Sequence, residues 1–315
     1  MSGPVSTDDA APAPVDRPAA ARPTFDLIPS RATEVGGVTV RRALPRRQRR
    51  TVGAWCFVDH MGPADLAADV GLRVGPHPHV GLHTVTWLVE GEVVHRDSLG
   101  SEQPIRPGQL NLMTAGRGVA HAEASTDPAG EGGRVHGVQL WVAQPDGTRD
   151  GDPAFEHHAE LPAAGLGGFT ATVLVGELPG ARSAARADTP LLGVELRTAI
   201  GVATVPLDPS FEHAVVVLEG ELAVDEEPVG PGALAYLGTG REELRVEADR
   251  PTVALLLGGE PFGEPPLMWW NFVARTRDEI GRARADWEAG SDRFGAVGGD
   301  LPRIPAPLPV WTGRA

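Results

Sequence analysis

The stretch that decides the fold is GPHPHVGLHTVTWLVEGEVVHRDSLG, residues 75–100. It consists of apolar and β-branched runs of strand length, interrupted by the turn Glu90-Gly91-Glu92. Similar runs separated by glycine and proline turns continue on both sides of it, over much of the chain. The 40 glycines and 30 prolines favour many short strands joined by turns over long helices. The sequence therefore predicts an all-β protein.

The turn pattern of this stretch occurs twice. Leu88–Glu92 followed by Pro107-Gly108 resembles 217–221 followed by Pro231-Gly232, and Gly91 and Gly220 are 129 residues apart. A repeat of this length is typical of a small β-barrel domain that occurs in tandem. We expect a disordered tail over 1–24, a first barrel over 25–145, a linker over 146–165, a second barrel over 166–275, and a C-terminal helix and tail over 276–315.

One helix is expected, close to the C-terminus. Thr276-Arg277-Asp278-Glu279 is a capping box, with Thr276 as the N-cap. Ile280, Ala283 and Trp287 follow at helical spacing, and Gly290 ends the pattern. An amphipathic helix packed on a barrel is the predicted structure.

Composition excludes several classes of function. The net charge of −14 disfavours direct nucleic-acid binding, which depends on neutralising phosphates. No lysine is present, so Schiff-base chemistry and a phosphate-loop lysine are excluded. The single cysteine, Cys56, allows no internal disulfide, and no apolar run approaches the length of a membrane span. Because the N-terminus also lacks a signal-peptide pattern, we expect a cytoplasmic protein that does not bind membranes. We also expect it to be a monomer.

Two short motifs carry the predicted chemistry: His77-Pro78-His79 and His121-Ala122-Glu123. In a strand, side chains at i and i+2 point to the same face, so two adjacent strands would aim three imidazoles and one carboxylate at one point. Nitrogen and oxygen donors with room left for water or substrate suit a first-row transition metal. The second repeat offers only Glu212-His213 in the matching region, so the second barrel is expected to be metal-free and structural.

Three other features carry weaker signals. His83 shares a strand face with His79 by parity, so it is a candidate fifth ligand, a group that orients a ligand, or a pocket-lining side chain. His95-Arg96-Asp97 resembles the start of a kinase catalytic loop, but Glu102 replaces the required asparagine, so we assign it no role. A basic cluster is either a partner contact or a solvated loop; it comprises Arg41, Arg42, Arg46, Arg47, Arg49 and Arg50.

Together these motifs resemble the pirin family of bicupin proteins. The resemblance covers about residues 36–295 and is strongest in the first barrel. The residues that carry it are His77-Pro78-His79, Thr84-Val85-Thr86-Trp87-Leu88, Glu90-Gly91, His95-Arg96-Asp97-Ser98-Leu99-Gly100, Met113-Thr114-Ala115-Gly116, Gly118 and His121-Ala122-Glu123. Asp59-His60-Met61-Gly62-Pro63, Gln139-Leu140-Trp141-Val142 and Trp269-Trp270-Asn271-Phe272-Val273 also match.

The resemblance implies two cupin barrels with one metal, usually iron, in the N-terminal barrel. The family's ligands map onto His77, His79, His121 and Glu123. Some members resemble quercetin 2,3-dioxygenases, which open the flavonol ring with O₂ and release carbon monoxide. Others act as iron-dependent regulators that bind transcription factors or metabolic enzymes. The chain departs from the common family pattern at three positions that are expected to line the pocket: Val80 replaces arginine, Leu82 phenylalanine and His83 glutamate.

Three functions remain open from the sequence. The first is a dioxygenase with one Fe(II), or another first-row divalent metal, that acts on a small aromatic, flavonol-like substrate and O₂. Here Glu123 is the candidate base for the substrate hydroxyl, and His83 steers the substrate. The second is a non-catalytic regulator in which iron oxidation alters contact with a protein partner, for which the basic cluster is the place to look. The third is an isomerase or other cupin enzyme with Zn, Mn or Ni.

Overall fold

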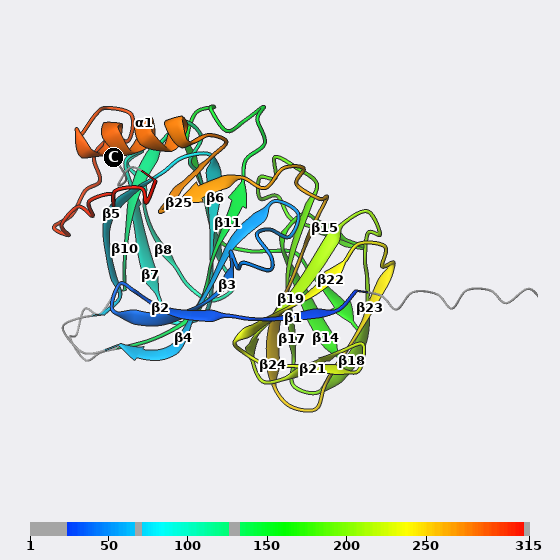
Figure 1. Cartoon of the computed structure of the whole chain (residues 1–315). Coiled ribbons are helices and arrows are strands. Elements are labelled where there is room, and N and C mark those ends of the chain that lie inside the picture. The colour runs from blue at the N-terminus through cyan, green and yellow to red at the C-terminus, as the bar shows by residue number, and fades with distance from the viewer. Residues whose placement is uncertain (1–23, 67–70, 126–132, 312–315) are drawn as a thin grey trace, which may run out of the picture.

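The computed structural model describes residues 24–66, 71–125 and 133–311. In this part the chain forms two β-domains side by side and one helix at the outer end of the first domain (Figure 1). The predicted tail over 1–24 lies, apart from Thr24, outside the described residues.

The first domain is built from two facing antiparallel sheets. The larger has the order β12 (Ala154–His158), β9 (Leu110–Thr114), β6 (Leu82–Glu90), β11 (Gly133–Ala143), β4 (Trp55–Leu66), β3 (Val38–Leu44) and β2 (Arg31–Val35). The smaller has the order β5 (Arg73–His79), β10 (Val119–Ser125), β7 (Val93–Asp97) and β8 (Glu102–Ile105). Strands of both sheets contribute to one buried cluster that includes Val40, Met61, Val93 and Ile105, as expected of a two-layer sandwich.

The second domain repeats this plan. Its larger sheet has the order β1 (Asp26–Pro29), β22 (Ala233–Gly238), β19 (Glu212–Glu219), β24 (Thr252–Gly259), β17 (Leu191–Thr198), β14 (Phe169–Val175) and β13 (Ala163–Leu166). Its smaller sheet has the order β18 (Gly201–Pro206), β23 (Glu243–Ala248), β20 (Leu222–Val224) and β21 (Glu227–Val229). Two sheets of seven and four strands thus occur twice, which confirms the all-β tandem repeat, although the sheets stay open rather than closing into barrels.

The interiors of the two domains differ. In the second domain both sheets are held together by a cluster of buried alanine, valine, leucine and phenylalanine side chains. In the first domain the corresponding layer contains polar and aromatic side chains, among them Asp59, Thr86 and Trp141. Among the described residues, the interior of the first domain therefore suits a polar site better than that of the second.

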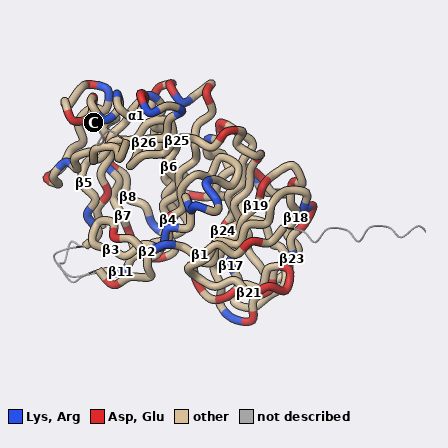
Figure 2. The backbone as a smooth tube through the Cα atoms, in the orientation of Figure 1, with Lys and Arg blue, Asp and Glu red and all other residues tan. Residues whose placement is uncertain are grey.

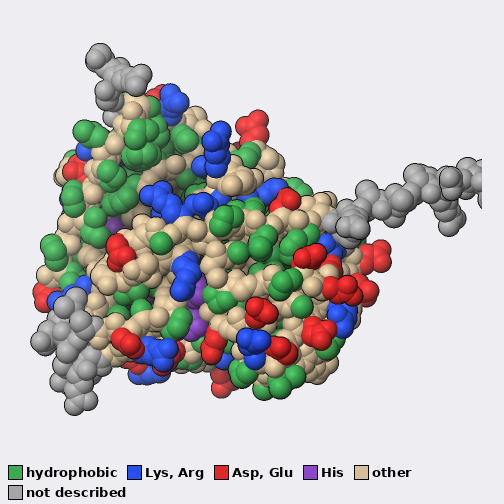
Figure 3. Space-filling view, turned by 60° about the horizontal axis from the view of Figure 1, so that its bottom comes forward, with side chains coloured by type: hydrophobic (Ala, Val, Ile, Leu, Met, Phe, Trp, Pro, Cys, Tyr) green, Lys and Arg blue, Asp and Glu red, His purple; other side chains and the backbone are tan. Residues whose placement is uncertain are grey.

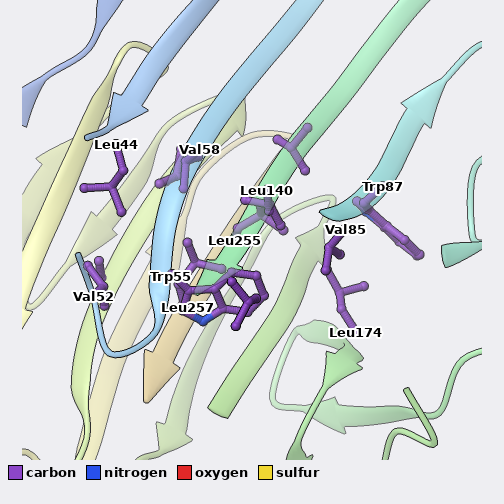
Figure 4. Close-up of a cluster of buried hydrophobic side chains, with 14 of the residues drawn as sticks. Leu44, Val52, Trp55, Val58, Val85, Trp87, Leu140, Leu174, Leu255 and Leu257 are labelled. Atoms are coloured by element: carbon purple, nitrogen blue, oxygen red, sulfur yellow. The ribbon is translucent and has the colours of Figure 1, made fainter. Parts of the chain in front are cut away.

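The outer faces of the two larger sheets pack against each other in one shared core (Figure 4). At its centre, the buried Trp55 donates its indole N–H to the carbonyl oxygens of Leu192 (3.0 Å) and Gly258 (3.1 Å) in the second domain. Gly193 leaves room for this ring, since an added Cβ would lie only 2.9 Å from Cζ2 of Trp55. The shared core fixes the two domains relative to each other.

Three segments lie outside the domain that the predicted boundaries give them; one of them, 267–274, was expected in the second barrel but packs on the first domain beside Val80. Strand β1 follows the tail directly but pairs with β22 of the second domain, so the chain begins there before it builds the first domain. Strand β12 lies within the segment predicted as a linker and pairs with β9 of the first sheet. Both pairings join residues far apart in sequence, which local patterns do not specify.

The C-terminal segment covers the first domain. It begins with the hairpin β25 (Leu267–Trp269)–β26 (Phe272–Ala274) and continues into α1 (Arg277–Glu288). A separate short hairpin, β15 (Glu177–Leu178)–β16 (Ala181–Arg182), lies between β14 and β17 in the sequence. As predicted, Thr276 is the N-cap: its hydroxyl accepts the N–H of Glu279 at 3.2 Å. Helix α1 buries Ile280 and Trp287 together with Val80 of the first domain. Within the described residues, no helix is long and apolar enough to cross a membrane.

Candidate metal centre

The two ligand motifs lie on neighbouring strands. β5 and β10 pair antiparallel, with His121 opposite His77 and Val119 opposite His79. The register shifts between His121 and Glu123, a local irregularity of the kind that re-aims a side chain at a sheet edge. All four predicted residues line the same cavity between the two sheets of the first domain.

The three imidazoles converge on one point. Donor atoms of His77, His79 and His121 all lie within 4.8 Å of one another, and Nε2 of His79 is 3.0 Å from Nε2 of His121. Two ligands at right angles around a metal, each with a bond of about 2.1 Å, are separated by roughly 3.0 Å. Nδ1 of His77 donates to the carbonyl oxygen of Gly75 at 2.9 Å, which leaves its Nε2 lone pair free. This geometry fits three nitrogen ligands of one ion.

Burial keeps these side chains in the form that a metal requires. It lowers the pKa of His77 from 6.5 to about 4 and lowers the pKa values of His79 and His121 well below 6.5. The imidazoles are therefore neutral, and their lone pairs are available, at neutral pH. Burial also raises the pKa of Glu123 above its usual 4.5, because an unpaired carboxylate is poorly solvated there. A divalent cation would offset that cost, so the residues fit a first-row divalent metal.

Glu123 belongs to a second, overlapping group of donors. Its carboxylate lies within 4.8 Å of donor atoms of His95 and His121. His121 faces both groups: Nε2 lies beside His79, and Nδ1 lies 3.3 Å from Nδ1 of His95. The structure thus brings Glu123 next to His121, in the same cavity as His77 and His79, and adds His95 to the surroundings of His121.

The cavity above these side chains has a volume of about 450 Å³. One wall is aromatic: Phe57 and Trp141 stack with centroids 4.0 Å apart, and Trp141 meets the edge of His79 at 5.1 Å. Trp270, Asn271 and Ile304 of the C-terminal segment also line the cavity. A cavity of this size with an apolar wall fits a flat organic molecule.

Four polar side chains lie side by side on neighbouring strands of the large sheet, two residues along from Phe57 and Trp141: Arg42, Asp59, Gln139 and Thr86. Arg42 donates to both carboxylate oxygens of Asp59 at 2.7 Å each. Gln139, opposite Asp59, accepts a hydrogen bond from Thr86 through Oε1 at 2.9 Å. Its buried Nε2 has no hydrogen-bond partner among the described residues. Because Gln139 lines the cavity, this N–H₂ group is a donor for a ligand.

The structure corrects the expectation that His83 lies at the metal or in its pocket. Gly81, with φ of 68°, separates β5 from β6, so the parity that starts at His79 does not continue to His83. His83 instead faces the second domain, where Nε2 lies 3.0 Å from Oδ2 of Asp188, while Nδ1 lies 2.9 Å from Oγ1 of Thr114. It joins the two domains and does not line the cavity.

His95 and Asp97 are the residues at this site that sequence reasoning missed. Both are buried, and β7 places His95 opposite Glu123 and Asp97 opposite His121. A His-x-Asp spacing on a strand is the same i, i+2 signal that marks the two ligand motifs, so it was present in the sequence.

The basic cluster is partly used inside the protein. Arg42 bridges to Asp59, Arg41 donates to the carbonyl oxygen of Gly62, and Arg49 stacks over the ring of Tyr236 in the second domain at 3.5 Å. The segment runs along the junction of the two domains (Figure 2). Three of its arginines therefore have structural roles.

The fold and the site define a two-domain cupin protein with a candidate mononuclear metal centre in its first domain. The family model for pirin matches residues 37–142, and the model for the pirin C-terminal cupin domain matches residues 194–295. The chain is 48% identical over 287 residues to a Pseudomonas aeruginosa protein provisionally named a quercetin 2,3-dioxygenase, covering 90% of each chain. The chain therefore belongs to the pirin family.

Further relatives agree with this assignment. A solved structure of quercetin 2,3-dioxygenase from Acinetobacter baumannii shares 44% identity and a TM-score of 0.87, covering 91% of this chain and 96% of that chain. Human pirin is 29% identical over 286 residues, covering 86% of this chain and 93% of the human protein. These similarities confirm the two-cupin fold and the resemblance that the motifs indicated.

Proposed function

We propose that the protein binds one divalent first-row metal, with Fe(II) favoured, through His77, His79, His121 and Glu123, and acts as a dioxygenase on a flavonol-like enol. The observation that carries the proposal is the convergence of three neutral imidazoles in a cavity with an aromatic wall. The names of the Pseudomonas and Acinetobacter relatives support this reaction class.

The residues of the chain have distinct tasks in this reaction. When bound, the metal supplies Lewis acidity to an enol hydroxyl and redox chemistry with O₂. Glu123, whose carboxylate lines the cavity beside His121, takes the proton of that hydroxyl. Phe57 and Trp141 give the substrate an apolar wall, and the Nε2 group of Gln139 donates to a second oxygen of the substrate.

The test is oxygen-dependent loss of quercetin by the Fe(II)-loaded protein. We expect turnover in air, none under argon, and loss of turnover in His121→Ala. A matched control is His158→Ala, since His158 lies on β12 and does not line the cavity. Quercetin loss that is unchanged in His121→Ala, or equal in air and argon, would refute the proposal.

A regulator is the competing proposal, and the cavity disfavours it. A partner-binding protein needs no ligand-sized space over its metal, whereas about 450 Å³ is present here. The arginines proposed for partner contact are in part tied to Asp59 and Tyr236. Acidic side chains gather over the second domain on the face shown in Figure 3, which agrees with the expectation of no direct nucleic-acid binding. Recovery of one protein partner only in the Fe(III) state would favour the regulator.

A further inference from the structure

A continuous line of hydrogen-bonded groups leads from a tight turn to Nδ1 of His121, the ring nitrogen that faces away from the converging imidazoles. Oδ1 of Asp97 accepts the backbone N–H groups of Leu99 and Ser101, both at 2.9 Å. Oδ2 of Asp97 lies 3.0 Å from Nε2 of His95. Nδ1 of His95 then lies 3.3 Å from Nδ1 of His121.

The Asp97 carboxylate determines which atom is the donor in each hydrogen bond of this line. A carboxylate accepts hydrogen bonds and donates none, so Nε2 of His95 carries a hydrogen and donates it to Asp97. A neutral imidazole with a hydrogen on Nε2 has its lone pair on Nδ1. In the neutral ring Nδ1 of His95 is therefore the acceptor, and Nδ1 of His121 is the donor to it.

His121 consequently has its lone pair on Nε2. That atom is the one that lies 3.0 Å from Nε2 of His79, on the side of the three converging imidazoles. A metal ligand needs this lone pair, and the opposite tautomer would place a hydrogen where the ion belongs. The line of groups thus selects the tautomer of His121 that can bind.

Packing holds the line in place. The ring of His95 stacks on Phe155 of β12, with centroids 4.5 Å apart and an interplanar angle of 14°. His95 and Asp97 are each 3% exposed, so water does not compete for their hydrogen bonds. β12, in the segment predicted as a linker, therefore contributes the surface that fixes the ring.

We propose that Asp97 and His95 are positioning residues that set the Nδ1–H tautomer of His121 and thereby prepare its Nε2 for the metal. The inference rests on the metal-binding part of the proposed function and not on the oxygenase reaction. It also assigns the overlapping group of His95, His121 and Glu123 a supporting role, since His121 cannot give Nδ1 to His95 as a donor and to a metal as a ligand at once.

Asp97→Asn is the direct test. Asparagine keeps an oxygen for Leu99 and Ser101 but presents an N–H₂ group to His95, which inverts the hydrogen bond and selects the other tautomer of each ring in turn. We expect Co(II) or Zn(II) affinity, measured by competition with a chelator, to fall 10- to 100-fold. In the metal-free protein, ¹⁵N shifts of the histidine rings should show His121 changing from the Nδ1–H to the Nε2–H tautomer.

Asp188→Asn is the matched control, because Asp188 also accepts from a buried histidine, His83, but lies outside the cavity. It should leave metal affinity within about twofold. His95→Phe is the second variant, for use if Asp97→Asn does not fold. It preserves the stack on Phe155 but removes the acceptor of the His121 hydrogen bond, so it should also weaken metal binding. The proposal would be overturned if Asp97→Asn and His95→Phe both left the metal affinity and the tautomer of His121 unchanged. It would also be overturned if Asp188→Asn weakened metal binding as much as they do.

The two proposals fail separately. If the wild-type protein binds no divalent metal, the proposed function is refuted, but the ¹⁵N spectra of the metal-free protein still report the tautomer of His121. If metal binds and quercetin is not consumed, the oxygenase is refuted while the affinity measurements still test Asp97 and His95.

Discussion

Replacing Gln139 by leucine tests how the cavity recognises its ligand. Leucine retains most of the volume of the side chain but removes the N–H₂ group that has no partner among the described residues. It also removes the acceptor of the Thr86 hydroxyl, although that loss is the same for every ligand. The substitution should therefore weaken only those ligands that place an oxygen at this point of the cavity.

The expected size follows from the kind of hydrogen bond. Gln139 lies two residues from Trp141 on β11, so its amide is roughly 7 Å along the strand from the aromatic wall. A neutral hydrogen bond contributes about 0.5–1.5 kcal/mol, which corresponds to a two- to twelvefold change in Kd. If the oxygen is ionised, the contribution rises to about 1.5–3 kcal/mol, or roughly 12- to 160-fold.

The assay is a titration under argon of metal-loaded protein with 3-hydroxyflavone and with flavonols that carry further hydroxyl groups. Wild-type protein should bind the hydroxylated compounds more tightly, and Gln139→Leu should remove that difference while 3-hydroxyflavone keeps its affinity. Equal losses for all compounds, or no loss for any, would refute the assignment of Gln139.

Three further predictions concern stability. Gly193→Ala forces a Cβ to within 2.9 Å of Trp55 and should lower the free energy of unfolding in urea by about 1–3 kcal/mol. Thr276→Ala removes the N-cap of α1 and should cost about 1 kcal/mol, with Thr276→Ser restoring it. Burial lowers the pKa of His213 from 6.5 to about 4, so the unfolded chain binds more protons between these values. Stability should therefore fall as the pH drops from about 6.5 to 4, by up to roughly 1.4 kcal/mol per pH unit for this group, and His213→Leu should flatten the dependence in thermal melts.

Local patterns in the sequence were sufficient for the all-β character of the chain, for its one described helix and for the convergence of His77, His79 and His121. The i, i+2 spacing of His77 and His79, and of His121 and Glu123, requires only that both segments be strands. The capping box at Thr276 likewise predicts the start of α1, since its contacts lie within one turn. These predictions depend on neighbours along the chain.

Long-range register was not accessible in the same way. His83 was assigned to the pocket because the break at Gly81 is not visible in an alternating pattern. His95 reaches His121 only through the pairing of β7 with β10, and no local signal gives that register. The aromatic wall and Gln139 come from β4 and β11, which meet the ligand strands across the interior. The sequence was therefore a better guide to the three converging histidines than to the residues around them.

Anomalous X-ray diffraction from crystals of the metal-loaded protein tests the central claim most directly. One anomalous peak is expected in the first domain, about 2.0–2.2 Å from Nε2 of His77, His79 and His121 and from the carboxylate of Glu123. Nδ1 of His121 should face His95 and not the metal. A peak bound through His95 and Nδ1 of His121, a peak in the second domain, or no peak at saturating metal would contradict the account.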